Sequence, residues 1–545
     1  MSSEFTLYPH FWRATNLFPE KEIVSRTDVG VEPHRYTYEA FGERVHALAH
    51  ALSELGVERG DRVGTFGWNH HRHFETYFAV PLLGAQLHTI NVQLPDDHVE
   101  HIVDDAADDV LFVDPGEPFE KIGRLYDRLD SVEEVVVMDE ALPDTDLPNV
   151  SAYEALIDGY DEPFSWPRLP GDLPAGMCYT SGTTGRPKGV EYTHEMVYAH
   201  SLMTITPDMF DIAERDVVMP VVPMFHVNGW ELPYAVSITG AKQVYPGTSP
   251  SAADLAELIE AEAVTFTAGV PTVWINLLEH LEDTGGDLSS LERILTGGSA
   301  VPESVMRRYD EEYDVTIEHA WGMTETMSVG SYSRPKSYMR SGSAEEKYAI
   351  RQKQGLLSPG LVMKIIDDDG EEVPWDGESF GELYVRGSTV VDEYYNQPTA
   401  TEEDFEEADD GRWLKTGDIV TVDEYGYLEI VDRAKDVIKS GGEWISSIEL
   451  ENELMKHDAV IEAVVVGVED DRWQERPIAC VVTQQGVDVD AEELREFLGR
   501  EYPRWWLPDE IVFVGEVPKT ATGKFDKKVV RDEYEDTNRR WTPGT

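Results

Sequence analysis

Apolar residues alternate between helical and strand spacing along the first part of the chain. Between residues 41 and 55 they recur every three or four positions, which predicts an amphipathic helix that ends at Gly56. Residues 74–83 have helical spacing as well. Short apolar runs predict strands at 63–66, 110–113 and 134–138. Because strands alternate with helices, we expect an α/β fold with mostly parallel sheets.

The pattern changes near residue 432. A strand predicted at 426–431 is followed by a charged segment and then by short elements of both kinds. These are predicted helices at 447–455 and 491–498 and predicted strands at 463–468, 478–483 and 510–514. We therefore expect a large N-terminal domain over residues 1–431, a linker at 432–439 and a small α+β C-terminal domain over 440–545.

Acidic residues dominate the charge of the chain. Asp and Glu number 106 against 45 Lys and Arg, which gives a formal net charge of −61 over 545 residues. The acidic runs, such as 367–369 and 402–407, are spread along the chain, which favours an acidic surface on a folded protein. Such a surface repels nucleic acid and anionic lipid, so we expect neither as a partner. Molar salt shortens the Debye length to about 3 Å, and we predict a protein adapted to a salt-rich cytoplasm, as in halophiles.

Cysteine usage and hydropathy agree with that location. Cys178 and Cys480 lie far apart in apolar segments, so we expect two buried thiols rather than a disulfide framework. The first residues lack a basic start followed by an apolar run, and no apolar stretch approaches the roughly 20 residues that a membrane-spanning helix needs. We expect a cytoplasmic protein with no integral membrane segment.

A loop rich in glycine and hydroxyl groups carries the strongest sign of chemistry. Its candidate phosphate-binding residues are Thr180, Ser181, Gly182, Thr183, Thr184, Gly185 and Lys188. Glycines let backbone N–H groups turn toward an anion, hydroxyls add donors, and a lysine adds charge, which suits a polyphosphate. The segment is not a Walker loop, because Lys188 is followed by Gly189 and not by Ser or Thr.

Six segments, in order, resemble the motifs of the acyl-adenylate-forming superfamily, which includes acyl-CoA synthetases, luciferases and peptide-synthetase adenylation domains. They are 179–190, 297–300, 321–325, 414–418, 432–436 and 518–524. The resemblance covers nearly the whole chain. It implies a large multi-sheet N-terminal adenylation domain with a small mobile C-terminal domain. It also implies an AMP-forming ligase that uses ATP, Mg²⁺ and coenzyme A to activate a small-molecule carboxylic acid.

The resemblance also implies roles for single residues in the nucleotide site. Contacts to the nucleotide are implied for Gly298, Ser299, Ala300, His319, Ala320, Trp321 and Gly322. Trp321 offers a flat face for adenine, with a place in the hydrophobic core as the alternative. Thr324 and Glu325 are implied at the reaction centre. Glu325 and the Thr180 hydroxyl suit Mg²⁺, which prefers oxygen ligands.

The C-terminal part supplies the remaining implied residues. Asp418 is expected to bind the ribose hydroxyls, and Arg433 to bind ribose or the α-phosphate, or else to pair with a nearby carboxylate. Lys524 is implied to be catalytic, because its cation offsets the charge that develops when a carboxylate meets the α-phosphate. Lys435 matches the residue about which the C-terminal domain of relatives rotates between two half-reactions. Contacts to coenzyme A are implied for Lys439, Gly441, Gly442 and Trp444.

The segment 220–230 narrows the choice of acid. It resembles bacterial medium- and long-chain fatty acyl-CoA ligases, in which the tryptophan gates an apolar acyl tunnel. The implied acyl contacts are His226, Val227 and Trp230, with a place in the core as the alternative. A fatty acid is therefore favoured, and a short-chain, branched or aromatic acid is the alternative. Those ligases form dimers through the N-terminal part, so we expect a homodimer.

Three other functions use similar sequence features. Transfer to a carrier protein or luciferase-like oxygenation shares the ATP chemistry, but no carrier domain follows Lys524, which favours free coenzyme A. A nucleotide-binding regulator without catalysis is disfavoured, because both Glu325 and Lys524 are present.

Overall fold

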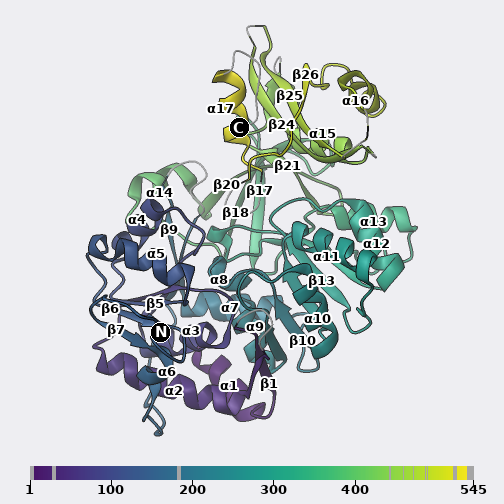
Figure 1. The fold of residues 1–545 in the computed structure, drawn as a ribbon. Helices are drawn as coiled ribbons and strands as arrows, with labels where there is room; N and C mark the ends of the chain where they lie inside the picture. Colours follow the sequence, from purple (N-terminus) through teal and green to yellow (C-terminus); the bar gives the residue numbers. More distant parts are fainter. Residues whose placement is uncertain are drawn as a thin grey trace. The chain divides into compact units, whose positions relative to one another are not determined.

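A computed structural model describes residues 5–27, 32–180, 186–440, 443–457, 459–470, 472–484, 487, 489–519 and 525–536. The chain forms two compact units (Figure 1). Unit 1 comprises residues 1–362 and 386–414, and unit 2 comprises residues 363–385 and 415–545. The mixed α/β class predicted from the sequence is confirmed. The domain bounds placed at 431 and 440 stay predictions.

The first sheet of unit 1 has a parallel centre and antiparallel edges. Its strand order is β16-β15-β14-β13-β12-β10-β11-β1-β2. The strands are β1 (Glu22–Ser25), β2 (His34–Thr37), β10 (Val217–Pro220), β11 (Lys242–Tyr245), β12 (Phe266–Gly269), β13 (Arg293–Gly297), β14 (Thr316–Trp321), β15 (Ser331–Tyr332) and β16 (Leu356–Leu357). Neighbours from β14 to β1 are parallel, whereas β15, β16 and β2 are added antiparallel. The parallel centre agrees with the prediction, and the antiparallel edges were not foreseen.

The second sheet of unit 1 positions the glycine-rich loop. Its order is β7-β6-β5-β3-β4-β8-β9. The strands are β3 (Arg62–Phe66), β4 (Gln86–Thr89), β5 (Val110–Val113), β6 (Glu134–Val137), β7 (Val150–Ala152), β8 (Pro174–Tyr179) and β9 (Gly189–Thr193). All neighbours are parallel except β8 and β9, which form an antiparallel hairpin. The strands predicted at 63–66, 110–113 and 134–138 therefore exist at those positions.

Helices cover both sheets of unit 1. They are α1 (Tyr8–Leu17), α2 (Tyr38–Glu54), α3 (His71–Leu83), α4 (Asp96–Ala106), α5 (Glu117–Leu125), α6 (Tyr153–Ile157), α7 (His194–Thr204), α8 (Val227–Trp230), α9 (Leu232–Thr239), α10 (Ala252–Glu262), α11 (Pro271–Thr284), α12 (Glu303–Tyr313), α13 (Ala344–Gln352) and α14 (Pro398–Asp404). One core contains Leu258 of α10, Trp274 of α11 and Ile317 of β14. Another contains Ile102 of α4 and Val135 of β6. Each such side chain stabilises the fold by roughly 1.5–3 kcal/mol when buried.

Unit 2 is built on two smaller sheets. Its strands are β17 (Leu361–Ile366), β18 (Phe380–Gly387), β20 (Gly411–Val422), β21 (Leu428–Arg433), β22 (Ile438–Ser440), β23 (Glu443–Ile445), β24 (Val460–Asp470), β25 (Gln474–Thr483) and β26 (Glu510–Phe513). The ends of β17, β18 and β20 belong to unit 1, where β19 (Phe405–Ala408) pairs with residues 411–414. One sheet has the order β17-β18-β20 with β21 beside β20, and the other has the order β23-β22-β25-β24 with β26 beside β25.

The helices of unit 2 match the sequence closely. They are α15 (Ser447–Met455), α16 (Ala491–Leu498) and α17 (Lys527–Asp536). The first two begin and end at the predicted residues. They pack their apolar faces on β24 and β25 in a core that contains Leu450, Leu494 and Val465. Strand β24 is longer than predicted, because its antiparallel pairing with β25 continues through polar residues as far as Asp470.

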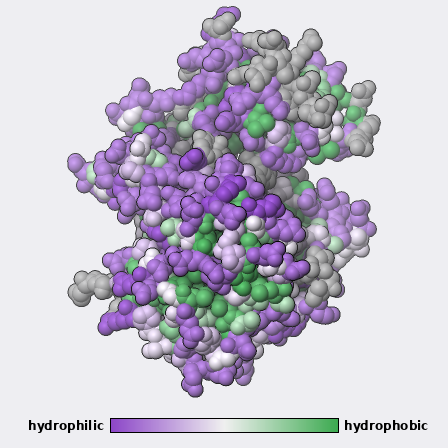
Figure 2. Space-filling model, turned by 60° about the vertical axis from the view of Figure 1, so that its left-hand side comes forward, coloured by the Kyte–Doolittle hydropathy of each residue, from purple (hydrophilic) through white to green (hydrophobic). Residues whose placement is uncertain are grey.

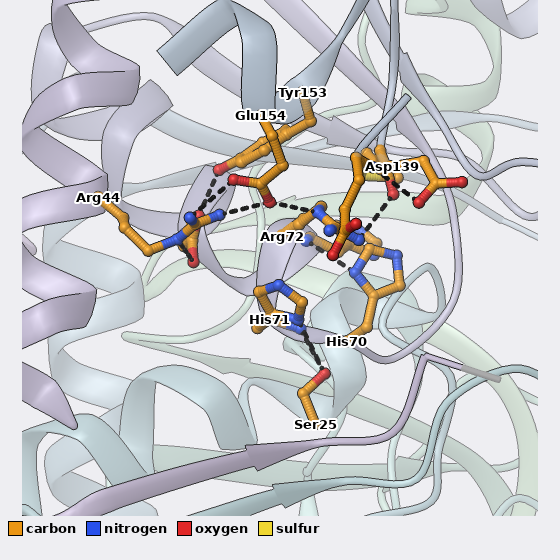
Figure 3. Close-up of polar contacts among 12 residues, drawn as sticks. Ser25, Arg44, His70, His71, Arg72, Asp139, Tyr153 and Glu154 are labelled. Carbon is orange, nitrogen blue, oxygen red and sulfur yellow. Dashed lines mark hydrogen bonds and ion pairs between the residues drawn. The ribbon is translucent and has the colours of Figure 1, made fainter. Parts of the chain in front are cut away.

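A partly buried network of ion pairs joins α2, α3 and α6 of unit 1 (Figure 3). Arg44 donates to Glu75 at 2.8 Å and to both carboxylate oxygens of Glu154 at 2.8 and 2.9 Å. Arg72 donates to Glu154 at 2.7 Å, and the Tyr153 hydroxyl donates to Glu75. Burial alone would raise the pKa of Glu154, but the hydrogen bonds from the two arginines lower it below its ordinary value. Because the charges are paired, the network holds the three helices together.

The surface is mostly hydrophilic. Figure 2 shows polar residues over much of the displayed face, with hydrophobic residues gathered in the lower half of the view. Among the exposed large apolar side chains are Phe5, Tyr8 and Trp12 at the start of unit 1, which are 56%, 43% and 43% exposed. Within the described residues, no helix combines the length and the apolar character that crossing a bilayer requires.

Candidate active site

The glycine-rich loop is closed at its neck by two hydrogen bonds. It connects β8 to β9, and the antiparallel pairing of these strands brings residues 180 and 188 together. The backbone N–H of Thr180 donates to the carbonyl oxygen of Lys188 at 2.9 Å. The N–H of Lys188 donates to the Thr180 hydroxyl at 3.1 Å. Ser181, Gly182, Thr183, Thr184 and Gly185 lie outside the described residues.

Lys188 is held by an acidic and an aromatic residue from later in the chain. Its ammonium group forms an ion pair with Asp404 at the end of α14. It also lies 4.4 Å from the centre of the Tyr394 ring, within the range of a cation–π contact. The side chain is partly exposed, so the lysine is oriented and can still meet a ligand. This arrangement fits the predicted contact with a polyphosphate.

Tyr394 links that lysine to the predicted metal ligand. Its hydroxyl lies 2.7 Å from Oε1 of Glu325 and 3.0 Å from Oδ2 of Asp404. Burial and the neighbouring Glu325 charge raise the pKa of Tyr394, so the phenol stays neutral. One hydroxyl hydrogen cannot satisfy two carboxylates at once. The Tyr394 hydroxyl thus lies between the Glu325 and Asp404 carboxylates, and Asp404 also pairs with Lys188.

Glu325 is fixed by a turn that requires glycine. It lies in the short 3₁₀ turn Thr324–Thr326 after β14, and it is 6% exposed. A side chain at Gly322 would lie 1.7 Å from the carbonyl oxygen of Ser328, so only glycine fits. The Tyr192 hydroxyl donates to the carbonyl oxygen of Thr324 at 2.8 Å. The predicted reaction-centre pair thus lies on a rigid turn.

The predicted adenine turn lies beside β14. Gly298 follows β13 with a φ of +88°, a conformation that favours glycine. The ring nitrogens of His319 lie 3.1 Å from the carbonyl oxygen of Ser299 and 3.0 Å from that of Gln352. Burial lowers the pKa of His319, and a neutral ring donates to one of these carbonyls at a time. His319 therefore supports the turn that includes Ala300.

Trp321 ends β14 and is 5% exposed. A side chain at Gly330 would lie 2.3 Å from its ring, so the ring packs closely on this glycine. Its neighbour Ala320 pairs with Gly297 in the sheet. Trp321 therefore stands at the predicted adenine turn, while its own packing also fits the core alternative.

The predicted acyl contacts come from a left-handed turn. The φ values of residues 227–230, which form α8, are 44°, 50°, 64° and 56°, and Glu231 follows at 59°. For residues other than glycine this region costs roughly 1–2 kcal/mol each, and a β-branched residue such as Val227 is rarely found there. Trp230 is 8% exposed, and a side chain at Gly297 would lie 3.7 Å from its ring. Trp230 thus reaches the end of β13, and His226 precedes the turn.

Two predicted residues of unit 2 pair with each other. Nε of Arg433 lies 2.9 Å from Oδ1 of Asp418, which is nearly completely buried. Arg433 also donates to the carbonyl oxygen of Thr416 at 3.3 Å. Pairing with a carboxylate is one of the alternatives that the sequence left open for Arg433. The partly exposed guanidinium holds the Asp418 carboxylate in place.

The remaining residues of unit 2 are described only in part. Lys435 is exposed, and Lys439 lies 3.5 Å from Asp368. Gly441, Gly442, Lys524 and the side chain of Trp444 lie outside the described residues. Lys519, within the predicted lysine loop at 518–524, forms an isolated antiparallel bridge with Phe525.

Sequence reasoning missed Tyr394, Asp404, Asn228 and Glu231. Tyr394 and Glu325 are 69 residues apart, and only the fold brings them together. The pattern of an aromatic pair before Asn396 and Pro398, followed by an acidic helix, was the available signal. Asn228 and Glu231 lay inside the predicted acyl segment, but their polar side chains gave no sign that they point inward.

Comparison with known proteins defines the class. The profile of the AMP-binding enzyme family matches residues 11–395, and that of the AMP-binding enzyme C-terminal domain matches residues 449–524. The chain therefore belongs to the AMP-binding enzyme family. The AMP-binding enzyme match includes the site residues of unit 1 from Thr180 to Tyr394.

Particular relatives narrow the class. A long-chain-fatty-acid–CoA ligase of Thermus thermophilus is 45% identical over 98% of this chain and 96% of its own length. A 3-methylmercaptopropionyl-CoA ligase of Ruegeria lacuscaerulensis is 41% identical over 95% of both chains. The solved anthranilate CoA ligase AuaEII with anthranoyl-AMP has a TM-score of 0.87 at 25% identity and covers 98% of both chains. The prediction of an AMP-forming acyl-CoA synthetase is confirmed by these likenesses.

Proposed function

We propose that the chain is an AMP-forming fatty acid–CoA ligase. The observation that carries this function is the series Lys188, Asp404, Tyr394 and Glu325, which connects the neck of the glycine-rich loop to a buried carboxylate. A medium-chain-fatty-acid–CoA ligase of Ectopseudomonas oleovorans, 38% identical over 95% of this chain and 93% of its own length, supports a fatty acid together with the Thermus relative.

In the first half-reaction, a carboxylate oxygen forms a bond to the α-phosphorus of ATP while the bond to pyrophosphate breaks. Residues 180–188 bind the outgoing phosphates through N–H groups, hydroxyls and the Lys188 cation. Thr180, Glu325 and Asp404 carry oxygen atoms of the kind that Mg²⁺ prefers, and the Tyr394 hydroxyl lies between the two carboxylates. Bound Mg²⁺ would neutralise phosphate charge there. Lys524 offsets the charge between acid and α-phosphate.

In the second half-reaction, the thiolate of coenzyme A attacks the acyl carbon and AMP leaves with the electrons of the broken C–O bond. Asp418, oriented by Arg433, binds the ribose hydroxyls. Lys435 acts as the hinge between the two half-reactions, and Lys439, Gly441, Gly442 and Trp444 bind coenzyme A. These roles rest on the resemblance of the chain to the superfamily.

Product identification tests the proposal. The enzyme is incubated with ATP, Mg²⁺ and a series of saturated acids from short to long, with and without coenzyme A. We expect pyrophosphate and AMP with medium or long chains, and an acyl thioester only when coenzyme A is present. A maximum at a short, branched or aromatic acid would favour the alternative that the methylmercaptopropionyl relative suggests. Release of ADP or orthophosphate would overturn the proposal.

We also propose a homodimer formed through the N-terminal part. Phe5, Tyr8 and Trp12 support it, because three large apolar side chains are exposed within eight positions. The Phe5 ring stacks on Tyr198 of α7 at 5.0 Å, so the exposed surface extends to that helix. Light scattering should give twice the chain mass for the wild type and a lower mass for Trp12→Glu. A monomeric wild type would end this proposal.

The net charge of −61 supports a salt-rich cytoplasm as the working environment. Self-repulsion of this size destabilises a compact state unless salt screens it. Activity should therefore require high salt.

A further inference from the structure

Glu231 closes the left-handed turn that carries Trp230, and its side chain is completely buried. It is 0% exposed, and its Oε1 accepts a hydrogen bond from Nδ2 of Asn228 at 2.8 Å. Its Oε2 has no hydrogen-bond partner in the part of the chain that the structure describes. A buried carboxylate requires a cation or several donors, and one amide donor is not enough. The geometry therefore suits an un-ionised carboxyl group.

Asn228 connects the acid to the sheet beneath it. Its Oδ1 accepts from the Thr89 hydroxyl of β4 at 3.0 Å and lies 3.4 Å from the Cys178 sulfur of β8. Its Nδ2 is the donor to Glu231. A left-handed backbone persists only when its surroundings over-determine it. The Asn228 and Glu231 side chains supply that restraint for the turn, because both come from the turn itself.

The surroundings of Glu231 contain no compensating cation among the described residues. The titratable groups that face it are Tyr77 of α3, Cys178 of β8, Tyr192 of β9 and Tyr234 of α9. Burial raises the pKa of Cys178 to about 12 and that of each tyrosine above its ordinary value, so all four are neutral. Burial, opposed by the Asn228 hydrogen bond, raises the pKa of Glu231 to about 8.

We propose that Glu231 is a positioning residue for acyl binding: its neutral carboxyl group holds the turn at residues 227–231, and with it Trp230, in the arrangement that accepts the acyl chain. This inference rests on the proposed function and on the acyl contact that the resemblance implies for Trp230. Ionisation of Glu231 places a charge in an apolar site without a cation. The turn then relaxes and acyl binding weakens, while the nucleotide residues on other elements keep their contacts.

The expected effect follows from the titration of one group. If only the neutral form binds the acyl chain, the apparent KM for the acid equals its intrinsic value divided by the neutral fraction. With a pKa of about 8, that fraction falls by about tenfold between pH 7 and pH 9. The apparent KM for dodecanoate should therefore rise by about tenfold over this interval. The KM for ATP should not change.

Pyrophosphate release measured from pH 7 to pH 9 tests the proposal. Glu231→Gln keeps an acceptor for Asn228 without a titrating group, and it should remove the alkaline rise. Glu449→Gln is the matched control. Burial and the neighbouring Glu429 charge raise the pKa of Glu449 to about 7, but it lies on α15 of unit 2, and the rise should persist in that variant.

The outcomes separate this proposal from the function on which it rests. If none of the tested acids supports pyrophosphate release at pH 7, the proposed function and this inference are refuted together. If the wild type is active but its KM for the fatty acid does not change between pH 7 and pH 9, the inference alone is overturned. This result does not depend on whether Glu231→Gln folds. An alkaline rise that persists in Glu231→Gln, or an equal rise in the KM for ATP, would also overturn it.

Discussion

Removal of one hydroxyl group from Tyr394 tests whether its contacts position the reaction centre. Tyr394→Phe keeps the ring, which lies 5.6 Å from that of Phe405 and 4.4 Å from the Lys188 ammonium group. It removes the donor that lies 2.7 Å from the buried carboxylate of Glu325. A hydrogen bond to a charged group contributes about 1.5–3 kcal/mol, and 1.4 kcal/mol corresponds to about tenfold. We expect kcat/KM for ATP to fall by roughly 10- to 100-fold.

The assay is pyrophosphate release at saturating fatty acid while ATP and Mg²⁺ are varied separately. The Mg²⁺ concentration for half-maximal rate should rise, because Glu325 is no longer oriented. Tyr395→Phe is the matched control for loss of a hydroxyl group, since the neighbouring Tyr395 ring lies 4.3 Å from the Arg62 guanidinium. Thermal unfolding of both variants reports any loss of stability. A Tyr394→Phe enzyme within about twofold of wild type, or an equal loss in Tyr395→Phe, would refute the reasoning.

Four further outcomes are expected. Lys524→Ala should abolish acyl-AMP formation and spare thioester formation from supplied acyl-AMP, and equal loss of both half-reactions would contradict its role. Glu75→Ala should lower the free energy of unfolding by about 3–5 kcal/mol in urea titrations, because it removes one of the two carboxylates that pair with Arg44 and the acceptor of the Tyr153 hydroxyl. A change below about 1 kcal/mol would show that the network is dispensable. The folded-state pKa of Glu154 is lowered, so its ion pairs stabilise the fold above the ordinary glutamate pKa and lose that contribution as the pH falls through the folded value. In Glu154→Gln the free energy of unfolding should therefore fall less steeply with decreasing pH than in the wild type, and an unchanged pH dependence in acid titrations would contradict this role. Dilution from molar to millimolar KCl should lower the melting temperature, and an unchanged temperature would exclude the salt adaptation.

The sequence predicted elements well where one face is apolar and the spacing is regular. Helices α15 and α16 begin and end at the predicted residues, since their buried faces pack on one core. Strand β20 was not predicted as a single strand. The strand includes Lys415, Thr416 and Gly417, which do not form an apolar pattern, and Gly417 has a φ of +69°. The extended conformation of β20 therefore depends on pairing with neighbouring strands.

The residues of the candidate site also fall into two groups: those that lie in short sequence motifs and those that only the fold brings together. Lys188 and Glu325 were predicted as site residues because each lies in a short motif whose residue types suit phosphate and metal. Tyr394 and Asp404 were not found, because their importance comes from distances across unit 1 and not from neighbours in the sequence. For Arg433 the sequence allowed both a nucleotide contact and a carboxylate partner, and the ion pair with Asp418 is a tertiary contact between adjacent strands that spacing alone could not select.

The turn at residues 227–231 contradicts local preference twice. Val227 and Trp230 adopt a left-handed backbone that non-glycine residues avoid, and Glu231 is buried although burial opposes a charged carboxyl group. Neither feature improves stability, and an ordinary right-handed helix with an apolar residue at 231 would avoid both. Local rules fail mainly where binding or catalysis requires a strained arrangement. Because the strain and the buried acid coincide in the segment that carries Trp230, we infer that the turn serves acyl binding rather than folding.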